Sequence, residues 1–338
     1  MAHLDAGPPR EILVLGGTAW VSGAVARLAL AQGHRVTCLA RGSSGDVPDG
    51  ASLVRADRGE PGAYDGLTDR SWDLVVDVSR QPLHVATAVA ALAGRTRHWV
   101  FVSTASVYAD DSVPGQDESA AVHEPWSGAG LAPPEEYGPA KVACERALLE
   151  AFPGALVARA GLIVGYGDRS DRFGYWPARF ARAGADDEQV LVPPPSDPCQ
   201  VVDVADLVAW LLRCGLSGTG GVMNAVGPVR TLGDVVAAAR RVTGSRARPV
   251  AASGPWLEDQ GVEPWMGPES LPLWLPLPQY AGHPTRDRSR AVAAGLGSRP
   301  LEETVADALR WEQELGLDRP RAAGLSPARE HELLALLP

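Results

Sequence analysis

Short apolar runs recur through the first third of the chain, separated by stretches with helical spacing. The runs are apolar throughout rather than alternating with polar residues, which is typical of strands buried on both faces of a parallel sheet. Strands are predicted at 11–15, 35–40, 52–56, 74–78 and 98–103, and helices at 20–32 and 83–93. Because crossovers between parallel strands are right-handed, this α/β pattern predicts a doubly wound parallel sheet of the Rossmann type.

The later part of the chain has a looser pattern. A segment rich in Pro, Gly, Asp and Glu at 109–136 predicts a long surface loop, and loops of that length inside a compact domain are usually functional. One further strand is predicted at 155–164, and helices are predicted at 136–152, 204–213, 232–242, 301–315 and 326–337. Ser326 and Pro327 occupy the N-cap and N1 positions of the last helix.

These patterns divide the chain into segments of different kinds. Residues 1–10 are expected to form a flexible leader, and residues 11–164 a dinucleotide-binding Rossmann domain with a further core segment near 200–226. Residues 165–199 and 227–338 lack a repeated strand–helix rhythm. They are expected to form a smaller C-terminal α/β lobe that binds substrate and ends in the terminal helices.

Composition narrows the classes of protein that fit this pattern. The chain has 31 basic and 41 acidic residues, and its net charge of −10 argues against nucleic acid as a partner. It contains no run of about 20 apolar residues, so no membrane span is expected. The four cysteines are widely separated and give no support for a metal site or disulfides. The first residues lack a signal peptide, so a cytoplasmic enzyme acting on a small molecule is expected.

The first predicted strand ends in a glycine turn that precedes a helix. Gly16 permits a tight turn, and the free amides at the start of the helix point toward a pyrophosphate. Read as G-x-x-G-x-x-G, the turn has Ala19 and Ser22 at its second and third glycine positions. Both replacements are small enough to keep the close approach. Gly16, Thr18 and Ala19 are therefore predicted to bind a dinucleotide.

The end of the second strand bears on the choice of cofactor. An acidic residue usually binds the ribose hydroxyls of NAD at this position, whereas this chain has Ala40 and Arg41. Because arginine pairs with a 2′-phosphate, NADP(H) is preferred over NAD(H), which stays possible. Asp57, after the third strand, is expected to meet the adenine edge. Val78 and Ser79, at the end of the fourth strand, are expected to line the same crevice.

Tyr137 and Lys141 lie one helical turn apart on the same face of a predicted helix. A free tyrosine has a pKa of about 10 and is a poor proton donor or acceptor at neutral pH. A nearby lysine cation favours the phenolate and brings the group toward a useful range. The same lysine can donate to the nicotinamide ribose, so the pair is predicted to serve both the reaction and the cofactor.

The fifth strand ends in a cluster of hydroxyl residues, Ser103, Thr104 and Ser106. The carboxyl end of a parallel strand opens into the ligand crevice. A hydroxyl there can donate to a substrate oxygen whose charge changes during hydride transfer. Because side chains alternate along a strand, only some of the three can do so.

In this order, the motifs resemble the extended short-chain dehydrogenase/reductase superfamily, in its NAD-dependent epimerase/dehydratase branch. The resemblance rests on the glycine turn, the S-T-A-S-V-Y strand end, the tyrosine–lysine pair, Arg159 with the G-L-I-V-G segment 161–165, and the V-D-V-A-D segment 202–206. The glycine turn, G-G-T-x-x-x-S-G, is similar to an atypical subgroup that includes chloroplast stem-loop-binding-like proteins. Together the motifs cover roughly residues 11–315.

The resemblance implies a role for several residues. Tyr137 is the general acid/base, Lys141 its partner, and Thr104 the hydroxyl that binds the substrate oxygen. It also implies backbone contacts of Trp20 and Val21 with the pyrophosphate and of Ala160 and Gly161 with the nicotinamide.

The residues after Thr104 limit the reaction. Dehydratases of the family have an Asp-Glu pair there and decarboxylating members a glutamate, whereas this chain has Ala105 and Ser106, so both reactions are disfavoured. An enzyme that exchanges NADP(H) with solvent fits Arg41, and the expected reaction is NADPH-dependent reduction of a ketone or aldehyde. The alternatives are a sugar epimerase that keeps its cofactor bound and, in another class, a non-catalytic protein that senses NADP(H).

The second half offers few signals for the substrate. Arg169 and Arg172 are expected to clamp a phosphate or carboxylate, and Tyr175 and Trp176 to stack on a ring. Arg286 is also expected to face the cleft. The tryptophans at 256, 265 and 274 are expected to pack inside the small lobe instead. Finally, the helices at 83–93 and 136–152 pair across a dimer interface in the resembled family, which implies a homodimer.

Overall fold

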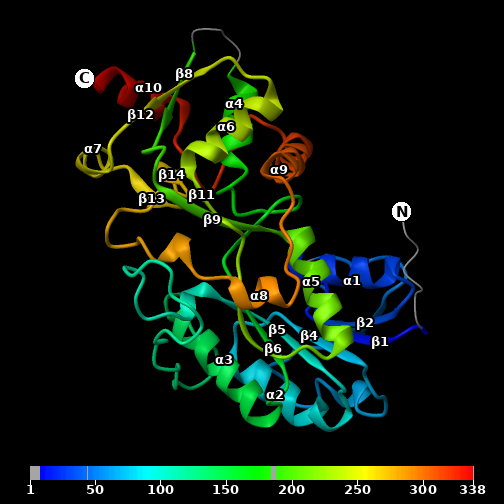
Figure 1. Ribbon diagram of the computed structural model, residues 1–338. Helices are drawn as coiled ribbons and strands as arrows, with labels where there is room; N and C mark the ends of the chain where they lie inside the picture. The colour runs from blue at the N-terminus through cyan, green and yellow to red at the C-terminus, as the bar shows by residue number, and fades with distance from the viewer. Residues whose placement is uncertain (1–7, 44, 184–187, 338) are drawn as a thin grey trace.

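The computed structural model describes residues 8–43, 45–183 and 188–337. Residues 1–7, most of the expected leader, lie outside the described residues. Figure 1 shows two lobes, with the N-terminal half of the chain in the lower lobe and the C-terminal helices in the upper one.

A parallel sheet of seven strands forms the centre of the lower lobe. Its order is β10-β6-β5-β4-β1-β2-β3, which confirms the predicted doubly wound α/β arrangement. The strands are β1 (Glu11–Leu15), β2 (Arg35–Ala40), β3 (Ser52–Arg55), β4 (Leu74–Asp77), β5 (Trp99–Thr104), β6 (Leu156–Ala160) and β10 (Gly221–Ala225). The chain reverses its direction across the sheet between β1 and β4, and ligands bind at such a switch point beyond the carboxyl ends of the strands.

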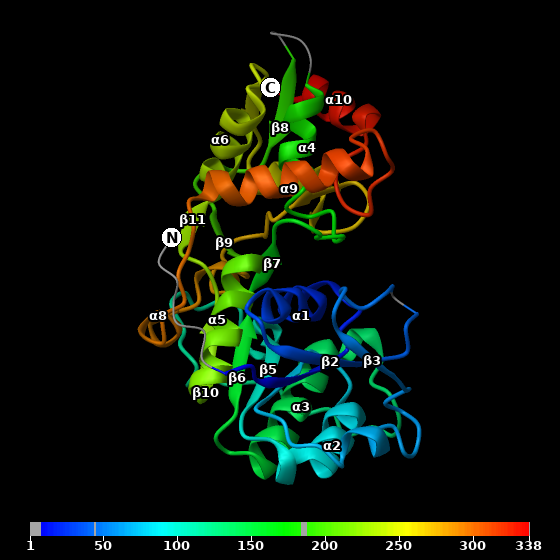
Figure 2. The ribbon, with the colours of Figure 1, turned by 90° about the vertical axis from the view of Figure 1, so that its right-hand side faces the viewer.

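Helices cover both faces of this sheet (Figures 1 and 2). Helices α1 (Trp20–Ala31) and α5 (Val204–Ser217) pack on one face, and α2 (Pro82–Leu92) and α3 (Tyr137–Ala151) on the other. Apart from the edge strand β3, the strands between them are mostly buried, which explains their continuous apolar sequence. Helices α2 and α3 lie side by side, and a homodimer formed through them stays a prediction.

The strand predicted at 155–164 is wrong as a single element. Gly161 separates β6 from β7 (Leu162–Val164), which leaves the large sheet and pairs in parallel with β9 (Pro198–Asp203). A Cβ at Gly161 would lie 2.9 Å from a methyl group of Val226, so the backbone can make this close crossing only at a residue without a side chain. The chain therefore enters the upper lobe directly from β6.

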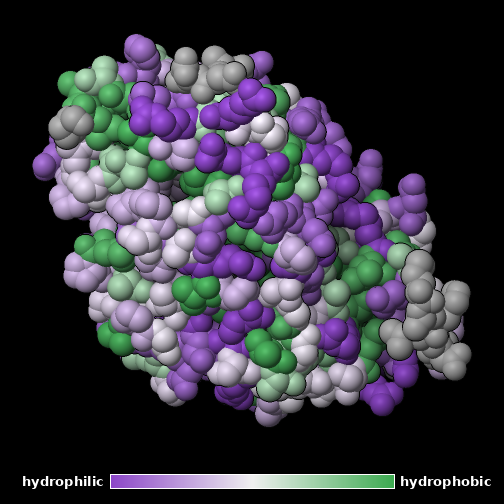
Figure 3. Space-filling view, turned by 45° about the horizontal axis from the view of Figure 1, so that its top comes forward, coloured by the Kyte–Doolittle hydropathy of each residue, from purple (hydrophilic) through white to green (hydrophobic). Residues whose placement is uncertain are grey.

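The upper lobe combines small sheets with helices. Strand β11 (Val229–Thr231) pairs antiparallel with β9. Two further pairs are parallel, β12 (Arg248–Ala251) with β8 (Gln189–Val192) and β13 (Glu263–Trp265) with β14 (Ser270–Pro272). The helices of this lobe are α4 (Tyr175–Arg182), α6 (Leu232–Thr243), α7 (Gly254–Asp259), α9 (Leu301–Leu315) and α10 (Pro327–Leu336), whereas the short α8 (Ser289–Ala293) packs against β10 of the large sheet. Ser326 caps α10 through the amide of Arg329, which confirms the predicted start. On the face shown in Figure 3, hydrophobic residues are scattered among hydrophilic ones.

A buried polar network fixes α3 to the sheet. The Glu145 carboxylate of α3 accepts a hydrogen bond of 2.5 Å from the Ser103 hydroxyl of β5 and one of 2.9 Å from the Arg159 guanidinium of β6. Arg159 also donates to the carbonyl of Glu118 in the long loop. Burial alone would lower the pKa of Arg159, but the paired carboxylate raises it above its ordinary value. The network thus joins two strands, a loop and the helix that contains the tyrosine–lysine pair.

Replacing Glu145 with alanine is expected to destabilise the protein by about 3–5 kcal/mol, because Arg159 would stay buried without its counter-ion. The measurement is the free energy of unfolding in urea. Glu150→Ala, on an exposed position of the same helix, is the control and should change stability by less than about 0.5 kcal/mol. Equal losses in the two variants would contradict a central role for the network.

Candidate active site

The turn after β1 has the geometry of a phosphate cradle. Gly16 has a φ of +99°, a conformation that favours glycine, and α1 begins four residues later. The Ser22 hydroxyl donates to the carbonyl of Gly16 at 2.5 Å and so closes the turn at the third position of the glycine pattern. Helix α1 has no side-chain cap and no acid in its first turn. Its free amides and positive dipole end are thus available to an anion, which fits a dinucleotide pyrophosphate.

A cavity of about 190 Å³ opens beside this turn at the ends of β1, β2 and β4. The predicted residues that line it are Gly16, Thr18, Ala19, Ala40, Arg41, Val78 and Ser79. Asp57 is not among its lining residues, in contrast to the expected adenine contact. Its carboxylate instead lies 3.7 Å from the Arg41 guanidinium and accepts from the amide of Gly59.

Sequence reasoning missed the other residues that line this cavity, and those with polar side chains are Ser43, Arg58 and His84. Arg58 is held by the buried Asp77 through two hydrogen bonds of 2.8 and 2.6 Å, and it also donates to the carbonyl of His84. Asp77 is the last residue of β4 and is fully buried. Because a buried carboxylate needs a cation close to it, an arginine partner could have been predicted from this aspartate.

A second cavity, of about 390 Å³, shares Ala19 and Val78 with the first and continues along the edge of the sheet. The structure brings together here the residues predicted for the reaction and for the nicotinamide, and these are Trp20, Val21, Thr104, Tyr137, Lys141, Ala160 and Gly161. Arg80 lines it as well and was not predicted. The two adjoining cavities and the uncapped helix fit an extended dinucleotide lying across the switch point.

Tyr137 reaches this cavity because the first turn of α3 lies against the end of β5. A Cβ at Gly138 would be 2.3 Å from the carbonyl oxygen of Ser106, so no larger residue permits this approach. Burial raises the pKa of Tyr137, and the Thr104 hydroxyl followed by the cations of Arg80 and Arg172 acts in the opposite direction. Thr104 thus lies where it can share a substrate oxygen with the phenol, as predicted from the strand end.

Lys141 is almost completely buried below the tyrosine. Its ammonium donates to the carbonyls of Ser79 at 2.8 Å and Val102 at 2.6 Å and lies 4.0 Å from the centre of the Phe101 ring. An ammonium has three donors, so one is left for a ligand in the cavity that Lys141 lines. Burial lowers the pKa of Lys141 to about 8.

A third cavity, of about 470 Å³, extends from Thr104 and Tyr137 into the space between the lobes. Arg169 and Arg172 line it, as predicted for substrate contacts. Trp265 lines it too, although the sequence favoured packing inside the lobe for that residue. His283, Asp168 and Ser170 were not predicted, and the His283 ring lies 3.3 Å from the Asp111 carboxylate. Asp168 and Ser170 flank the predicted Arg169, whereas Trp265 and His283 come from a distant part of the chain and no local pattern marks them as site residues.

Three of the residues predicted for the substrate lie elsewhere. Tyr175 and Trp176 are both 1% exposed, because they pack edge to face within the apolar core of the upper lobe. Arg286 is also 1% exposed, and its guanidinium is taken up by Asp111, by Gln116 and by the face of the Tyr108 ring. None of the three lines the cavities described above. Their role is structural.

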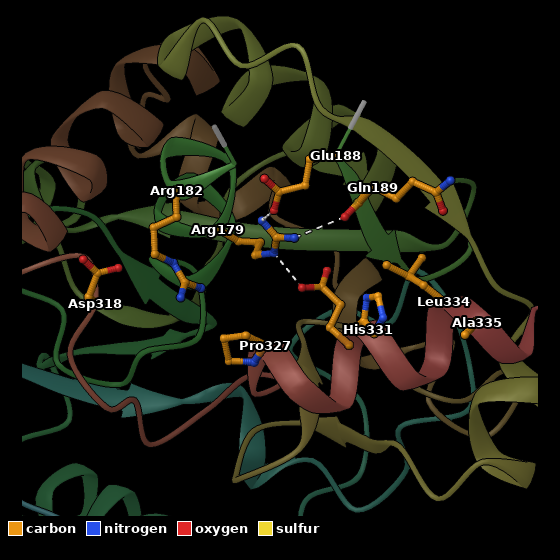
Figure 4. A pocket seen from close by; sticks show the side chains of 10 residues that line it. Arg179, Arg182, Glu188, Gln189, Asp318, Pro327, His331, Leu334 and Ala335 are labelled. Atoms are coloured by element: carbon orange, nitrogen blue, oxygen red, sulfur yellow. Dashed lines mark hydrogen bonds and ion pairs between the residues drawn. The ribbon is translucent and has the colours of Figure 1, made fainter. Parts of the chain in front are cut away.

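Other features of the described residues concern further cavities, membrane spans and metal sites. A separate cavity of about 640 Å³ lies between α4, β8 and α10, and Figure 4 shows Arg179 bound there by Glu188 and Glu330. It shares no lining residue with the three cavities around Tyr137. Within the described ranges no helix is long and apolar enough to cross a membrane, and no cluster of three or more potential metal ligands occurs.

Comparisons with known proteins place this geometry in context. The model of the NAD dependent epimerase/dehydratase family matches residues 12–225. A search of curated proteins finds no match. Solved structures share the fold, among them a putative epimerase from Burkholderia cenocepacia J2315, with 20% identity over 90% of this chain and 98% of that chain and a TM-score of 0.68.

Two other solved structures were obtained with ligands. The enzyme WbmH from Bordetella bronchiseptica, in complex with NAD+, is 17% identical over 91% of this chain and 99% of that chain, with a TM-score of 0.67. The UDP-glucose 4-epimerase of Thermotoga maritima, with UDP-glucose, is 17% identical over 90% of this chain and 99% of that chain, with a TM-score of 0.62. At these identities the likeness establishes the fold.

The lowered pKa of Lys141 predicts a pH-dependent stability. The unfolded chain binds this proton with the ordinary pKa of 10.5 and the folded chain with one of about 8, so the protonated lysine costs stability below pH 8. That cost diminishes as the pH rises from 8 toward 10.5. Relative to Lys141→Met, which lacks the titration, the wild type should therefore gain up to about 3 kcal/mol over this window. Urea unfolding of both proteins at pH 7, 8.5 and 9.5 measures this difference, and a difference independent of pH would contradict the assignment.

Proposed function

The chain belongs to the NAD dependent epimerase/dehydratase family, and on that premise we propose that it is an NAD(P)-dependent epimerase of a sugar-like small molecule. The proposal rests above all on one observation. Thr104 and Tyr137 line both the cavity assigned to the cofactor and the one assigned to the substrate, so a carbinol group can meet both residues at the junction.

The residues of the junction suit the removal and return of a proton. Tyr137 takes the proton of a substrate hydroxyl and later returns it to the same oxygen. Thr104 donates a hydrogen bond to that oxygen while its charge changes. Lys141, held by the carbonyls of Ser79 and Val102, lends its remaining donor to the cofactor side of the cavity. A bound nicotinamide dinucleotide supplies a reversible acceptor for hydride.

Epimerisation adds one requirement, which is room for the oxidised substrate to turn. The substrate cavity of about 470 Å³ lies within the range of small-molecule sites and is bounded by both lobes. Ala105 and Ser106 follow Thr104, and the absence of an acid at these two positions continues to disfavour elimination. The structural neighbours named above include a UDP-glucose 4-epimerase, which supports the same choice.

A reductase that exchanges NADPH with solvent is the second candidate. It is favoured by Arg41 and Ser43 at the end of β2, where the cavity has no acidic lining residue. The state of the purified protein separates the two candidates. Stoichiometric bound cofactor and interconversion of two sugar epimers, without net consumption of NADPH, are expected of the epimerase. Steady NADPH-consuming turnover on ketones or aldehydes would decide for the reductase.

Replacing Tyr137 with phenylalanine should lower turnover by about 10²–10⁴, because the general acid/base is lost, while cofactor binding stays nearly unchanged. Turnover is measured by epimer interconversion and binding by calorimetric titration. Tyr166→Phe is a matched control, because Tyr166 is as exposed as Tyr137, at 37%, and lies outside the three cavities. A Tyr137→Phe protein that retains most of its activity would overturn the proposal and favour a protein that only binds the cofactor.

We also propose that NADP(H) is preferred over NAD(H). The Arg41 guanidinium stands at the mouth of the first cavity, where it can pair with a 2′-phosphate. Arg41→Asp should weaken NADP+ binding about tenfold or more and leave NAD+ binding equal or stronger, and NAD+ serves as the internal control. The preference is refuted if the wild type binds NAD+ about tenfold more tightly than NADP+.

A further inference from the structure

Arg172 lines the substrate cavity without a counter-ion. Within the described residues no carboxylate lies within 4.0 Å of its guanidinium, and its side chain donates no hydrogen bond. Its Nε atom is inaccessible to solvent and still has no acceptor. Burial lowers the pKa of Arg172, with Asp168 as the largest opposing influence. A half-buried cation without a partner destabilises the folded protein unless an anion binds to it.

The charges around this arginine favour a negative ligand. Arg80, Arg169 and Arg172 line the two cavities that meet at Tyr137, and among the described residues that line them Asp168 is the one acidic residue. The Asp168 carboxylate is turned to the amide and hydroxyl of Ser170, at 2.8 and 3.0 Å. Burial raises its pKa, which favours the neutral form. In a protein with ten more acidic than basic residues, this is a local excess of positive charge.

The backbone next to Arg172 and its stacking partner adopts unfavourable conformations. Its guanidinium lies over the indole of Trp265, 5.2 Å from the ring centre. Trp265 has a φ of +67°, and Asp171, directly before the arginine, has a φ of +60°. Such conformations are unfavourable for residues with side chains, especially bulky ones, and they tend to occur at ligand clamps. Asp171 is fixed by Arg319 and by the amide of Ala322, and the amide of Trp265 donates to the carbonyl of Trp274 at 2.9 Å, so the backbone is anchored on both sides of the stack.

We propose that Arg172 anchors an anionic group of the substrate, a carboxylate or a phosphate, so that the protein acts on acidic sugar-like alcohols in preference to neutral ones. The inference rests on the proposed function for the identity of the reacting site, and it specifies the substrate class. Arg172 and Tyr137 line one cavity, so the acidic group and the reacting carbinol belong to the same small molecule. The Trp265 ring contributes a cation–π contact, and the Arg172 Nε atom is left without an acceptor among the described residues.

Binding measured apart from turnover tests this inference. The full-length Tyr137→Phe protein, loaded with the cofactor it binds more tightly, is titrated calorimetrically with D-glucuronate, D-glucose 6-phosphate and D-glucose. At least one acidic sugar should bind about tenfold or more tightly than glucose, because a charge-assisted pair forms. A gain for glucuronate alone identifies a carboxylate site, and a gain for the sugar phosphate alone identifies a phosphate site.

Adding Arg172→Gln should remove this preference by weakening the binding of the acidic sugar, whereas Arg172→Lys should retain part of it. Arg182→Gln is the matched control, because Arg182 lies on α4 in the separate cavity of Figure 4, and it should retain the full preference. The inference is overturned if neither acidic sugar binds more tightly than glucose, or if Arg172→Gln keeps the preference. If the proposed function failed while this inference held, the wild type would still bind the acidic sugar more tightly than glucose but would not interconvert any epimers.

Discussion

The buried carboxylate of Glu145 is the constraint on which the active site depends. It joins the end of β5, through Ser103, to Arg159 on β6 and thereby holds α3 against the edge of the sheet. Thr104 follows Ser103, Ala160 follows Arg159, and Lys141 lies one turn before Glu145 on the helix. Ser103 and Arg159 are thus each followed in their strands by a residue that lines the reaction cavity. Glu145 lies one helical turn after another such residue, Lys141.

Gly138 allows the attached helix α3 to bring Tyr137 to the reaction cavity. The first turn of α3 can touch the Ser106 carbonyl only because position 138 has no side chain, and the contact delivers Tyr137 to the hydroxyl of Thr104. Burial then has opposite effects on the two titratable residues of the pair, since it raises the pKa of the tyrosine and lowers that of the lysine. Both shifts favour the neutral forms. Nearby arginines, rather than the lysine alone, therefore supply the field that stabilises a phenolate.

Much of the lower lobe was predictable from the sequence, because a strand covered on both faces must be apolar throughout and a phosphate turn must contain glycine. The same reasoning failed at 155–164, where β6 and β7 are equally apolar and only Gly161 marks the crossing. In the upper lobe Tyr175 and Trp176 were mistaken for ligand contacts, although their apolar surface belongs to the core. Trp265 and His283 reach the cavity through tertiary packing over long sequence distances, which no local pattern encodes.

The direct passage from β6 to β7 has a mechanical consequence. A single glycine, with no intervening loop, joins the large sheet to the first strand of the upper lobe, and the cavity wall includes Ala160, Gly161 and Leu162 on both sides of that joint. The Trp20 indole adds a second tie by donating to the carbonyl of Tyr166. The substrate cavity therefore lies where the two lobes are joined. Because Ala160, Gly161 and Leu162 belong both to the connection and to the cavity wall, a rotation of one lobe against the other would change the shape of the cavity beside Tyr137.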